Sequence, residues 1–160
     1  MRQSVCRAVL AIAFVTGVGV PADAQLPNFG SGLEVPNYKE LPYLVESVSD
    51  AARAIGLTTD RLTTRLELRL REAGLVPVGT SYQHYVYLNV SVIGGAFSSN
   101  IRLNRFVSYL VDGREYVYSG ATTWSVLGSG THGGSAAYIL DAVDSQLDEF
   151  LNEYLKTNQR

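Results

Sequence analysis

Cysteine is almost absent from this sequence. The only one among the 160 residues is Cys6, and it lies in an N-terminal stretch that we expect to be removed. It also lacks the Leu-Ala-Gly or Leu-Ala-Ala context of bacterial lipoprotein processing. A mature chain without cysteine has no disulfide framework, no thiol nucleophile and no cysteine-bound metal. Its fold must therefore be stabilised by packing, and we expect it not to be a lipoprotein.

Histidine and basic residues are also scarce. The two histidines, His84 and His132, stand at no metal-ligand spacing, so the sequence indicates no metal site. Loss of Arg2, Arg7 and Asp23 with the N-terminal stretch changes 13 basic and 15 acidic residues to 11 and 14, a net charge of −3. Nucleic-acid binding depends on neutralising phosphates with Lys and Arg. We therefore expect no nucleic-acid partner, and no motif indicates a cofactor.

The N-terminus has the layout of a signal peptide. Residues 1–7 are polar with two positive charges, and residues 8–20 are apolar without one charged residue. The triplet Ala22-Asp23-Ala24 follows, which is the pattern that signal peptidase reads, so we predict cleavage after Ala24. The apolar run is shorter than the roughly 20 residues that span a bilayer. The sequence thus predicts a signal peptide over 1–24 and an exported protein, periplasmic or extracellular, that is not embedded in a membrane.

The mature chain divides into an arm and one domain. Residues 25–43 contain three prolines and two glycines without periodicity, which predicts a tether or a wrapped arm. Residues 44–158 show the alternating and helical patterns of a single domain. They predict a short strand at 44–49, a helix from about 58 to 73, strands at 83–93, 97–111 and 115–126, and a final helix that Ser135 caps.

The two helices each carry one apolar stripe. Leu62, Leu66 and Leu70 recur at intervals of four residues, and Gly74 follows as a helix terminator. The final helix has the stripe Ile139, Val143, Leu147, Phe150, Leu151 and Tyr154. The strand over 83–93 alternates apolar and polar residues, which is typical of a half-buried antiparallel strand. A two-layer α+β sandwich satisfies these patterns: an antiparallel sheet of three to four strands, with two helices on one face in the order β-α-β-β-β-α.

The strands are joined by clear turn signals. Gly94-Gly95 turns the chain, and Asp112-Gly113 suits a type I′ hairpin turn because both residues tolerate positive φ. In the strand over 97–111 the inward residues shift phase, which predicts a bulge near Asn104-Arg105.

Aromatic residues mark the face of the sheet opposite the helices. Tyrosine and tryptophan provide large contact area at interfaces with little loss of conformational freedom, so we predict a binding surface there. Strand propensity by itself also enriches aromatic residues in strands, and that interpretation stays open. The predicted binding residues are Tyr85, Tyr87, Tyr116, Tyr118 and Trp124.

The stretch from 128 to 135 holds a second candidate site. It contains a Gly-x-Gly-x-x-Gly pattern before a helix, but no parallel βαβ unit follows, so a dinucleotide site is not indicated. A loop of this kind can still place free N–H groups near an anion. A Ser-His-Asp arrangement using His132 is also conceivable, although no serine lies in a nucleophile elbow. The candidate loop residues are Gly130, His132, Gly133 and Ser135.

Two rows of charge accompany the helices. Arg61, Arg65 and Arg69 lie along the first helix, and Asp141, Asp144 and Asp148 lie along the last. We interpret both rows as solvated helix faces, since Ca²⁺ sites usually take oxygens from a loop and the arginines have acidic neighbours at helical spacing.

Three motifs resemble small exported bacterial proteins of unassigned function. They are Arg65-Leu66-Glu67-Leu68-Arg69-Leu70-Arg71-Glu72-Ala73-Gly74-Leu75 with Gly56-Leu57-Thr58 before it, Tyr87-Leu88-Asn89-Val90, and Gly120-Ala121-Thr122-Thr123-Trp124. The similarity spans roughly residues 44–158. At a looser level, the order of elements is similar to periplasmic modules of envelope-assembly and transport-accessory proteins. The resemblance implies an exported domain and no catalytic residue.

The sequence therefore predicts a non-enzymatic exported domain that binds a protein or an envelope component through its aromatic sheet face. One alternative is a small-ligand-binding protein or hydrolase-like enzyme that uses the loop with His132. Another is a structural or homo-oligomeric module that associates through an unpaired sheet edge.

Overall fold

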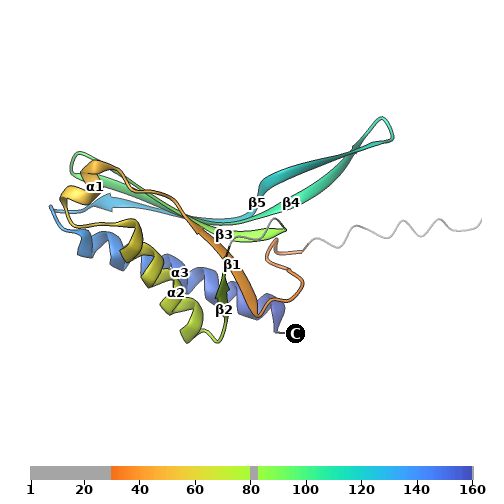
Figure 1. The fold of residues 1–160 in the computed structure, drawn as a ribbon, viewed down its shortest axis with the longest axis horizontal. Coiled ribbons are helices and arrows are strands. Elements are labelled where there is room, and N and C mark those ends of the chain that lie inside the picture. Colours follow the sequence, from red (N-terminus) through yellow and green to blue (C-terminus); the bar gives the residue numbers. More distant parts are fainter. Residues whose placement is uncertain (1–29, 80–82, 160) are drawn as a thin grey trace, which may run out of the picture.

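The computed structural model describes residues 30–79 and 83–159. The predicted signal peptide, its cleavage site, Cys6 and the start of the predicted arm lie outside the described residues. The elements in chain order are β1 (Glu40–Val45), α1 (Asp50–Ala54), α2 (Thr59–Glu72), β2 (Val76–Val78), β3 (His84–Ile93), β4 (Ala96–Val111), β5 (Arg114–Thr131) and α3 (Ala136–Asn158). Helices α2 and α3 lie on one side of the sheet, as Figure 1 shows.

The α+β class is confirmed, but the purely antiparallel sheet is wrong. The described strands form a mixed five-stranded sheet in the order β2-β1-β3-β4-β5. Strand β1 pairs in parallel with both β2 and β3, while β3, β4 and β5 pair antiparallel. Helices α1 and α2 lie between β1 and β2 in the sequence. A helical connection of this kind carries the chain back across the sheet, so the next strand can run in the same direction.

One predicted strand is shifted in the structure, and two short elements were not predicted from the sequence. The first strand covers Glu40–Val45 rather than 44–49, so Pro42 from the predicted arm is paired within it. Strand β2 was not predicted because it has three residues, Val76–Val78, with a proline in the middle. Helix α1, Asp50–Ala54, was not predicted because five residues are too few to show a period.

The two long helices are confirmed, with the capping expected from the sequence. In α2 the side chain of Thr58 accepts a hydrogen bond from the N–H of Arg61, and Leu62, Leu66 and Leu70 are buried. In α3 the side chain of Ser135 accepts from the N–H of Ala137. The apolar stripe of α3 is buried, as predicted: Ile139, Val143, Leu147, Phe150, Leu151 and Tyr154.

The predicted bulge exists, but its extra residues belong to β5. Between the pairs Leu103↔Trp124 and Asn104↔Thr122, strand β5 contains one additional residue, Thr123. A second irregularity follows where Arg105 pairs with Ala121, and Val107 with Tyr118. Each extra residue reverses the alternation of side chains along β5, and the two reversals together leave Tyr118 on the same side of the sheet as Trp124.

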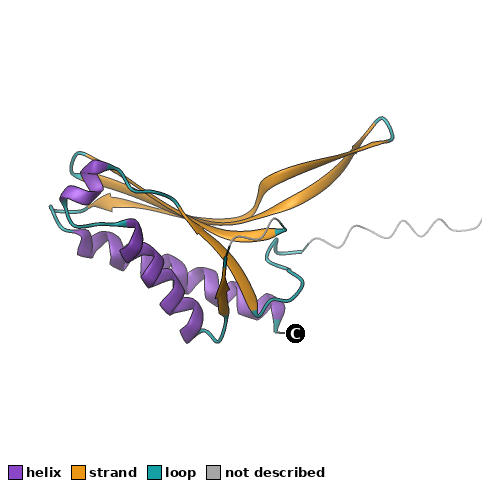
Figure 2. Cartoon of the chain, viewed as in Figure 1, coloured by secondary structure: helices purple, strands orange, loops and turns teal. Residues whose placement is uncertain are grey.

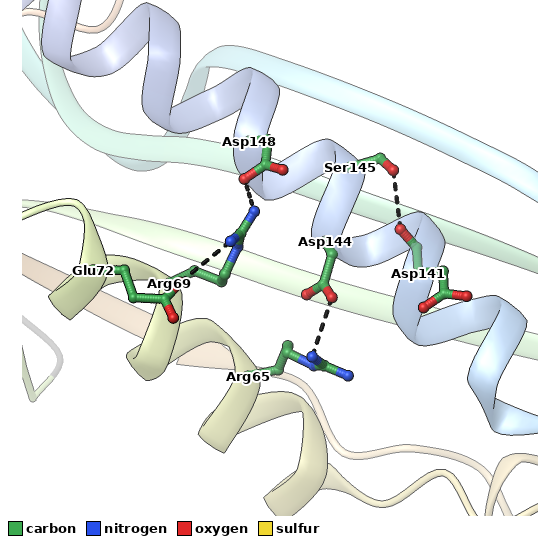
Figure 3. Close-up of polar contacts among 7 residues, drawn as sticks. All are labelled: Arg65, Arg69, Glu72, Asp141, Asp144, Ser145 and Asp148. Carbon is green, nitrogen blue, oxygen red and sulfur yellow. Dashed lines mark hydrogen bonds and ion pairs between the residues drawn. The ribbon is translucent and has the colours of Figure 1, made fainter.

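The charged rows of α2 and α3 face each other across the helix pair (Figure 3). Arg65 Nη1 lies 3.2 Å from Asp144 Oδ2, and Arg69 contacts both Asp148 and Glu72. The Arg69–Glu72 pair lies within α2, as the helical spacing predicts, whereas Arg65–Asp144 and Arg69–Asp148 connect α2 to α3, a contact that the interpretation as separate solvated faces did not include. The side chains stay partly exposed, so each pair contributes little stability, on the order of 0.2–1 kcal/mol.

The N-terminal segment, residues 30–39, wraps against the domain. Leu33 is fully buried. The side chain of Asn158 donates to the carbonyl of Leu33 and accepts from the N–H of Val35, at 2.9 and 3.1 Å. The carbonyl of Gly32 accepts from Thr123 Oγ1 at 2.7 Å. This segment is therefore fixed by contacts with residues from late in the chain.

Candidate functional site on the open face of the sheet

The sheet has one face that α2 and α3 do not cover (Figure 2), and polar and aromatic residues line it. On β3, buried and partly exposed residues alternate over the whole strand. Register places Tyr87 beside Arg102, Asn89 beside Asn100, and Leu44 of β1 beside Tyr87. We call this surface the open face. It contains Leu44, Glu46, Tyr85, Tyr87, Asn89, Ser91, Asn100, Arg102 and Asn104.

Tyr87 is the centre of a polar cluster on the open face. Its hydroxyl donates to the carboxylate of Glu46, and Asn89 Nδ2 donates to the same carboxylate oxygen at 2.5 Å. The guanidinium carbon of Arg102 lies 5.8 Å from the centroid of the Tyr87 ring, a cation–π geometry. Hydrogen bonds and the stacked cation thus hold the ring in one orientation before any partner binds.

Tyr85 lies next to this cluster and reaches the neighbouring strand. A Cβ placed on Gly120 would lie 3.7 Å from the Tyr85 hydroxyl, so this hydroxyl sits against the backbone of β5. Both tyrosines are half-buried. The structure therefore brings Tyr85 and Tyr87 together on the open face, as the sequence predicts.

Trp124 does not belong to this face, and its predicted placement there is wrong. It pairs with the buried residue Leu103 and packs against the core. Its ring centroid is 5.3 Å from that of Phe150, and its indole N–H donates to Glu153 of α3 at 2.7 Å. Leu103 faces the helices, so its partner Trp124 faces them too, and the residues of β5 alone do not show this pairing.

Tyr116 and Tyr118 are also away from the open face. They pair with Tyr109 and Val107 in the part of the β4–β5 hairpin that projects beyond the sheet. Counting alternation along β4 from the buried Leu103, their partners belong to the helix-covered side. The placement of these two tyrosines beside Tyr85 and Tyr87 is therefore wrong.

The glycine-rich stretch is mostly strand rather than loop. Strand β5 continues to Thr131, and Gly130 pairs with Phe97. His132 is only 5% exposed, and its Nε2 hydrogen-bonds the carbonyl of Gly94 at 2.8 Å. Its Nδ1 accepts from the N–H of Gly134 at 3.1 Å. Both ring nitrogens are engaged in fixing the turn into α3.

The remaining candidate loop residues also have structural partners or roles. Ser135 uses its hydroxyl to accept from the N–H of Ala137 at 3.2 Å, so it caps α3. Gly133 adopts a φ of 55° in the turn between β5 and α3. The structure thus gathers Gly130, His132, Gly133 and Ser135 at one corner, where their side chains and backbone build the strand-to-helix connection.

Glu46 is the site residue that the sequence did not single out. Glu46 follows β1, and its N–H bonds to the carbonyl of Leu88. Its role depends on the parallel pairing of β1 with β3, which brings it beside Tyr87 across 41 residues of sequence. Arg102 has the outward position of an alternating strand, and this signal alone places it on the open face.

Burial raises the pKa of Tyr87 to about 12, and its hydrogen bond to Glu46 adds to this effect. Burial also raises the pKa of Tyr154, whose hydroxyl donates to the carbonyl of Tyr38 at 2.9 Å. A phenol whose pKa is higher in the folded state than its ordinary value of about 10 ionises first in the unfolded chain. The stability that these two phenols contribute is therefore fully present below pH 10, and it is lost as the pH rises towards 12.

We expect Tyr154→Phe to reduce this loss of stability at alkaline pH. The variant gives up one hydrogen bond, worth about 1 kcal/mol at neutral pH, but it has no phenol to ionise at that position. Urea unfolding at neutral pH and at several pH values above 10 measures how steeply the free energy of unfolding falls with pH. Tyr138→Phe is the control, because the Tyr138 side chain is 63% exposed. Equal alkaline slopes for Tyr154→Phe and the native protein would contradict the assignment.

No family model matches this sequence. No curated protein matches it either. Among solved structures, a minor lipoprotein from Acinetobacter baumannii shows a distant resemblance that covers 74% of this chain and 89% of that chain, with 11% sequence identity and a TM-score of 0.26. Within the described residues, no helix has the length and apolar character needed to cross a membrane.

Proposed function

We propose that this chain is an exported, non-enzymatic domain that binds a protein or another envelope component through the open face of its sheet. The observation that carries the proposal is the pair of tyrosines, Tyr85 and Tyr87, held on a sheet face that α2 and α3 leave uncovered. Export rests on the signal-peptide pattern of the sequence. Tyrosine is among the residues most enriched at the energetic centres of interfaces.

The cluster around Tyr87 is organised before binding. Tyr87 and Asn89 both donate to Glu46, and Arg102 lies over the ring. Side chains fixed in this way lose little rotamer freedom when a partner arrives, and ordering such side chains otherwise costs about 0.5–1.5 kcal/mol each. The cluster is therefore suited to binding.

The open face favours a polar partner of low charge. Its two charged groups in the described strands, Glu46 and Arg102, have opposite signs and lie on either side of Tyr87. Around them stand asparagine and serine side chains, which donate and accept hydrogen bonds. A partner with exposed backbone or hydroxyl groups fits this surface, and a polyanion does not.

The proposal is tested by photo-crosslinking in the exported protein. A photoreactive amino acid at Ser91, an exposed position on the open face, should form a covalent adduct of defined mass with the partner. The double variant Tyr85→Ala/Tyr87→Ala should lower the adduct yield by tenfold or more, since truncating two central interface residues costs about 2 kcal/mol or more. Mass spectrometry identifies the adduct.

Two controls make the result interpretable. The same photoreactive group at Tyr138, an exposed tyrosine of α3, should give no such adduct. Circular dichroism must show that the double variant remains folded. An adduct that forms equally at Tyr138, or that survives the double substitution unchanged, would refute binding through the open face.

A further inference from the structure

The β4–β5 hairpin extends well beyond the rest of the sheet. Strand β3 pairs with β4 only as far as His84↔Arg105, so residues 106–118 form a two-stranded ribbon that projects from the domain (Figures 1 and 2). We call this part the hairpin extension. An isolated two-stranded ribbon is at best marginally stable in water, and nothing else among the described elements pairs with it.

The hairpin extension exposes many large apolar side chains. They are Phe106, Tyr109, Leu110, Val111, Tyr116, Val117 and Tyr118, exposed by between 39% and 74%. With about 150–250 Å² for a whole aromatic side chain, this set leaves on the order of 700 Å² of apolar surface open. A stable protein interface of standard size buries about 800 Å² on each partner. The extension alone nearly supplies one side of such an interface.

Both faces of the ribbon take part in this surface. Tyr109 and Tyr116 stack on one face with their ring centroids 5.7 Å apart. Leu110 and Val117 lie on the other face, at 74% and 69% exposure. A partner strand that pairs with the edge of the ribbon places its own side chains beside those on both faces.

The edge of β5 is open to such a partner. Strand β5 is the last strand of the sheet, and from Tyr116 to Thr131 it has neither a charged residue nor a proline. Proteins usually protect edge strands with these residues or with bulges. The irregularities of β5 lie between Tyr118 and Trp124, so the stretch from Arg114 to Tyr118 pairs regularly with β4, and its charges are confined to Arg114 and Glu115 beside the turn.

The charges at the tip exclude insertion of the extension into a bilayer. The turn carries Asp112, Arg114 and Glu115, and moving the tip into hydrocarbon would bury these three charges. One positive and two negative groups also provide little attraction for a strongly charged protein. The apolar surface lies behind this tip, along the shaft, where a neutral protein strand can reach it.

We propose that the hairpin extension binds a second copy of this chain. The β5 edges from Arg114 to Tyr118 of the two copies pair antiparallel across a two-fold axis, because an antiparallel pair of identical strands is self-complementary. The tyrosines of each ribbon then pack against the ribbon of the other copy, and the two sheets become continuous. This inference goes beyond the proposed function, because it uses a surface distinct from the open face around Tyr87.

Sedimentation equilibrium of the exported protein tests the proposal. The native chain should have the mass of a dimer at concentrations of about 10–100 µM. Val117→Lys/Tyr118→Lys should be monomeric, since it places charge on both faces of the unpaired edge. The matched control, Ile93→Lys/Leu127→Lys, changes two side chains that are 80% and 72% exposed elsewhere on the sheet and should remain a dimer. All three proteins should keep the same circular dichroism spectrum, because none of these side chains is in the core.

An engineered cysteine locates the interface independently. The mature chain has no native cysteine if the stretch with Cys6 is removed. Tyr116 lies on the two-fold axis of the proposed pairing, so Tyr116→Cys should yield one disulfide-linked dimer on oxidation, and Ile93→Cys should not. A native monomer at about 100 µM, a dimer that survives the lysine pair, or linkage through residue 93 instead of 116 would each overturn the proposal. A native protein that forms the dimer but gives no adduct at Ser91 would refute the open-face function alone.

Discussion

Phe150→Ala should lower the free energy of unfolding by about 3–5 kcal/mol. Phe150 is fully buried on α3, with its ring centroid 5.3 Å from that of Trp124 and 5.4 Å from that of Tyr154. Removing the ring leaves a cavity between helix and sheet and ends two aromatic contacts, each worth about 0.5–1.5 kcal/mol beyond burial. Because a whole domain is stable by only about 5–15 kcal/mol, the variant should be close to unfolding at 37 °C.

Urea unfolding followed by tryptophan fluorescence measures this effect directly. Trp124 is the only tryptophan in the sequence, and it contacts the substituted residue. Phe106→Ala is the matched control, since the chemical change is the same but the side chain is 39% exposed in the hairpin extension. We expect that control to cost less than about 1 kcal/mol. A similar cost for both variants would show that α3 does not form the centre of the core.

Gly32→Ala should lower the free energy of unfolding by about 3 kcal/mol, the second largest effect. Gly32 has a φ of 84°, and a Cβ there would lie 2.1 Å from the carbonyl oxygen of Thr123. The left-handed conformation costs alanine about 1–2 kcal/mol. Relief of the clash would also pull the carbonyl of Gly32 away from Thr123 Oγ1 and Arg105 Nη2, at about 1 kcal/mol for each hydrogen bond.

Comparison with a second glycine separates the cost of the left-handed conformation from the cost of the steric clash. Gly74, after α2, has a nearly equal φ of 75°, but no atom lies within 4 Å of the Cβ position. Gly74→Ala should therefore cost only the conformational part, about 1–2 kcal/mol. Thermal and urea unfolding of both variants measure the difference. If the two substitutions lower the free energy of unfolding by the same amount, residue 32 is not packed against β5 as described.

The sequence predicted those parts of the fold that depend on local patterns. The leucine stripe of α2 and the mixed stripe of α3 each repeat over several turns, and both helices form where these stripes are. The turn at Asp112-Gly113 forms with positive φ at both residues. The position of each strand in the sheet could not be predicted from local patterns, because it depends on partner strands that are far away in the sequence. The parallel pairing of β1 with β2 and β3 has no signal in the residues of β1 itself.

The candidate site was predicted only in part, for the same reason. Tyr85 and Tyr87 were placed correctly because β3 alternates without interruption. Trp124 was misplaced because its face follows from its pairing with the buried residue Leu103, and nothing in the residues of β5 marks that pairing. The sequence also gave no sign that His132 would be enclosed by the turn it stabilises, since both of its hydrogen-bond partners are backbone groups.

The wrapped N-terminal segment sets the order in which the chain can be completed. Residues 30–39 are synthesised early, but they are held by Thr123, Tyr154 and Asn158. Asn158 is the last residue of α3. The first part of the domain can therefore reach its final place only after the ribosome has released nearly the whole polypeptide, and loss of Asn158 would remove two of the hydrogen bonds that hold residues 30–39.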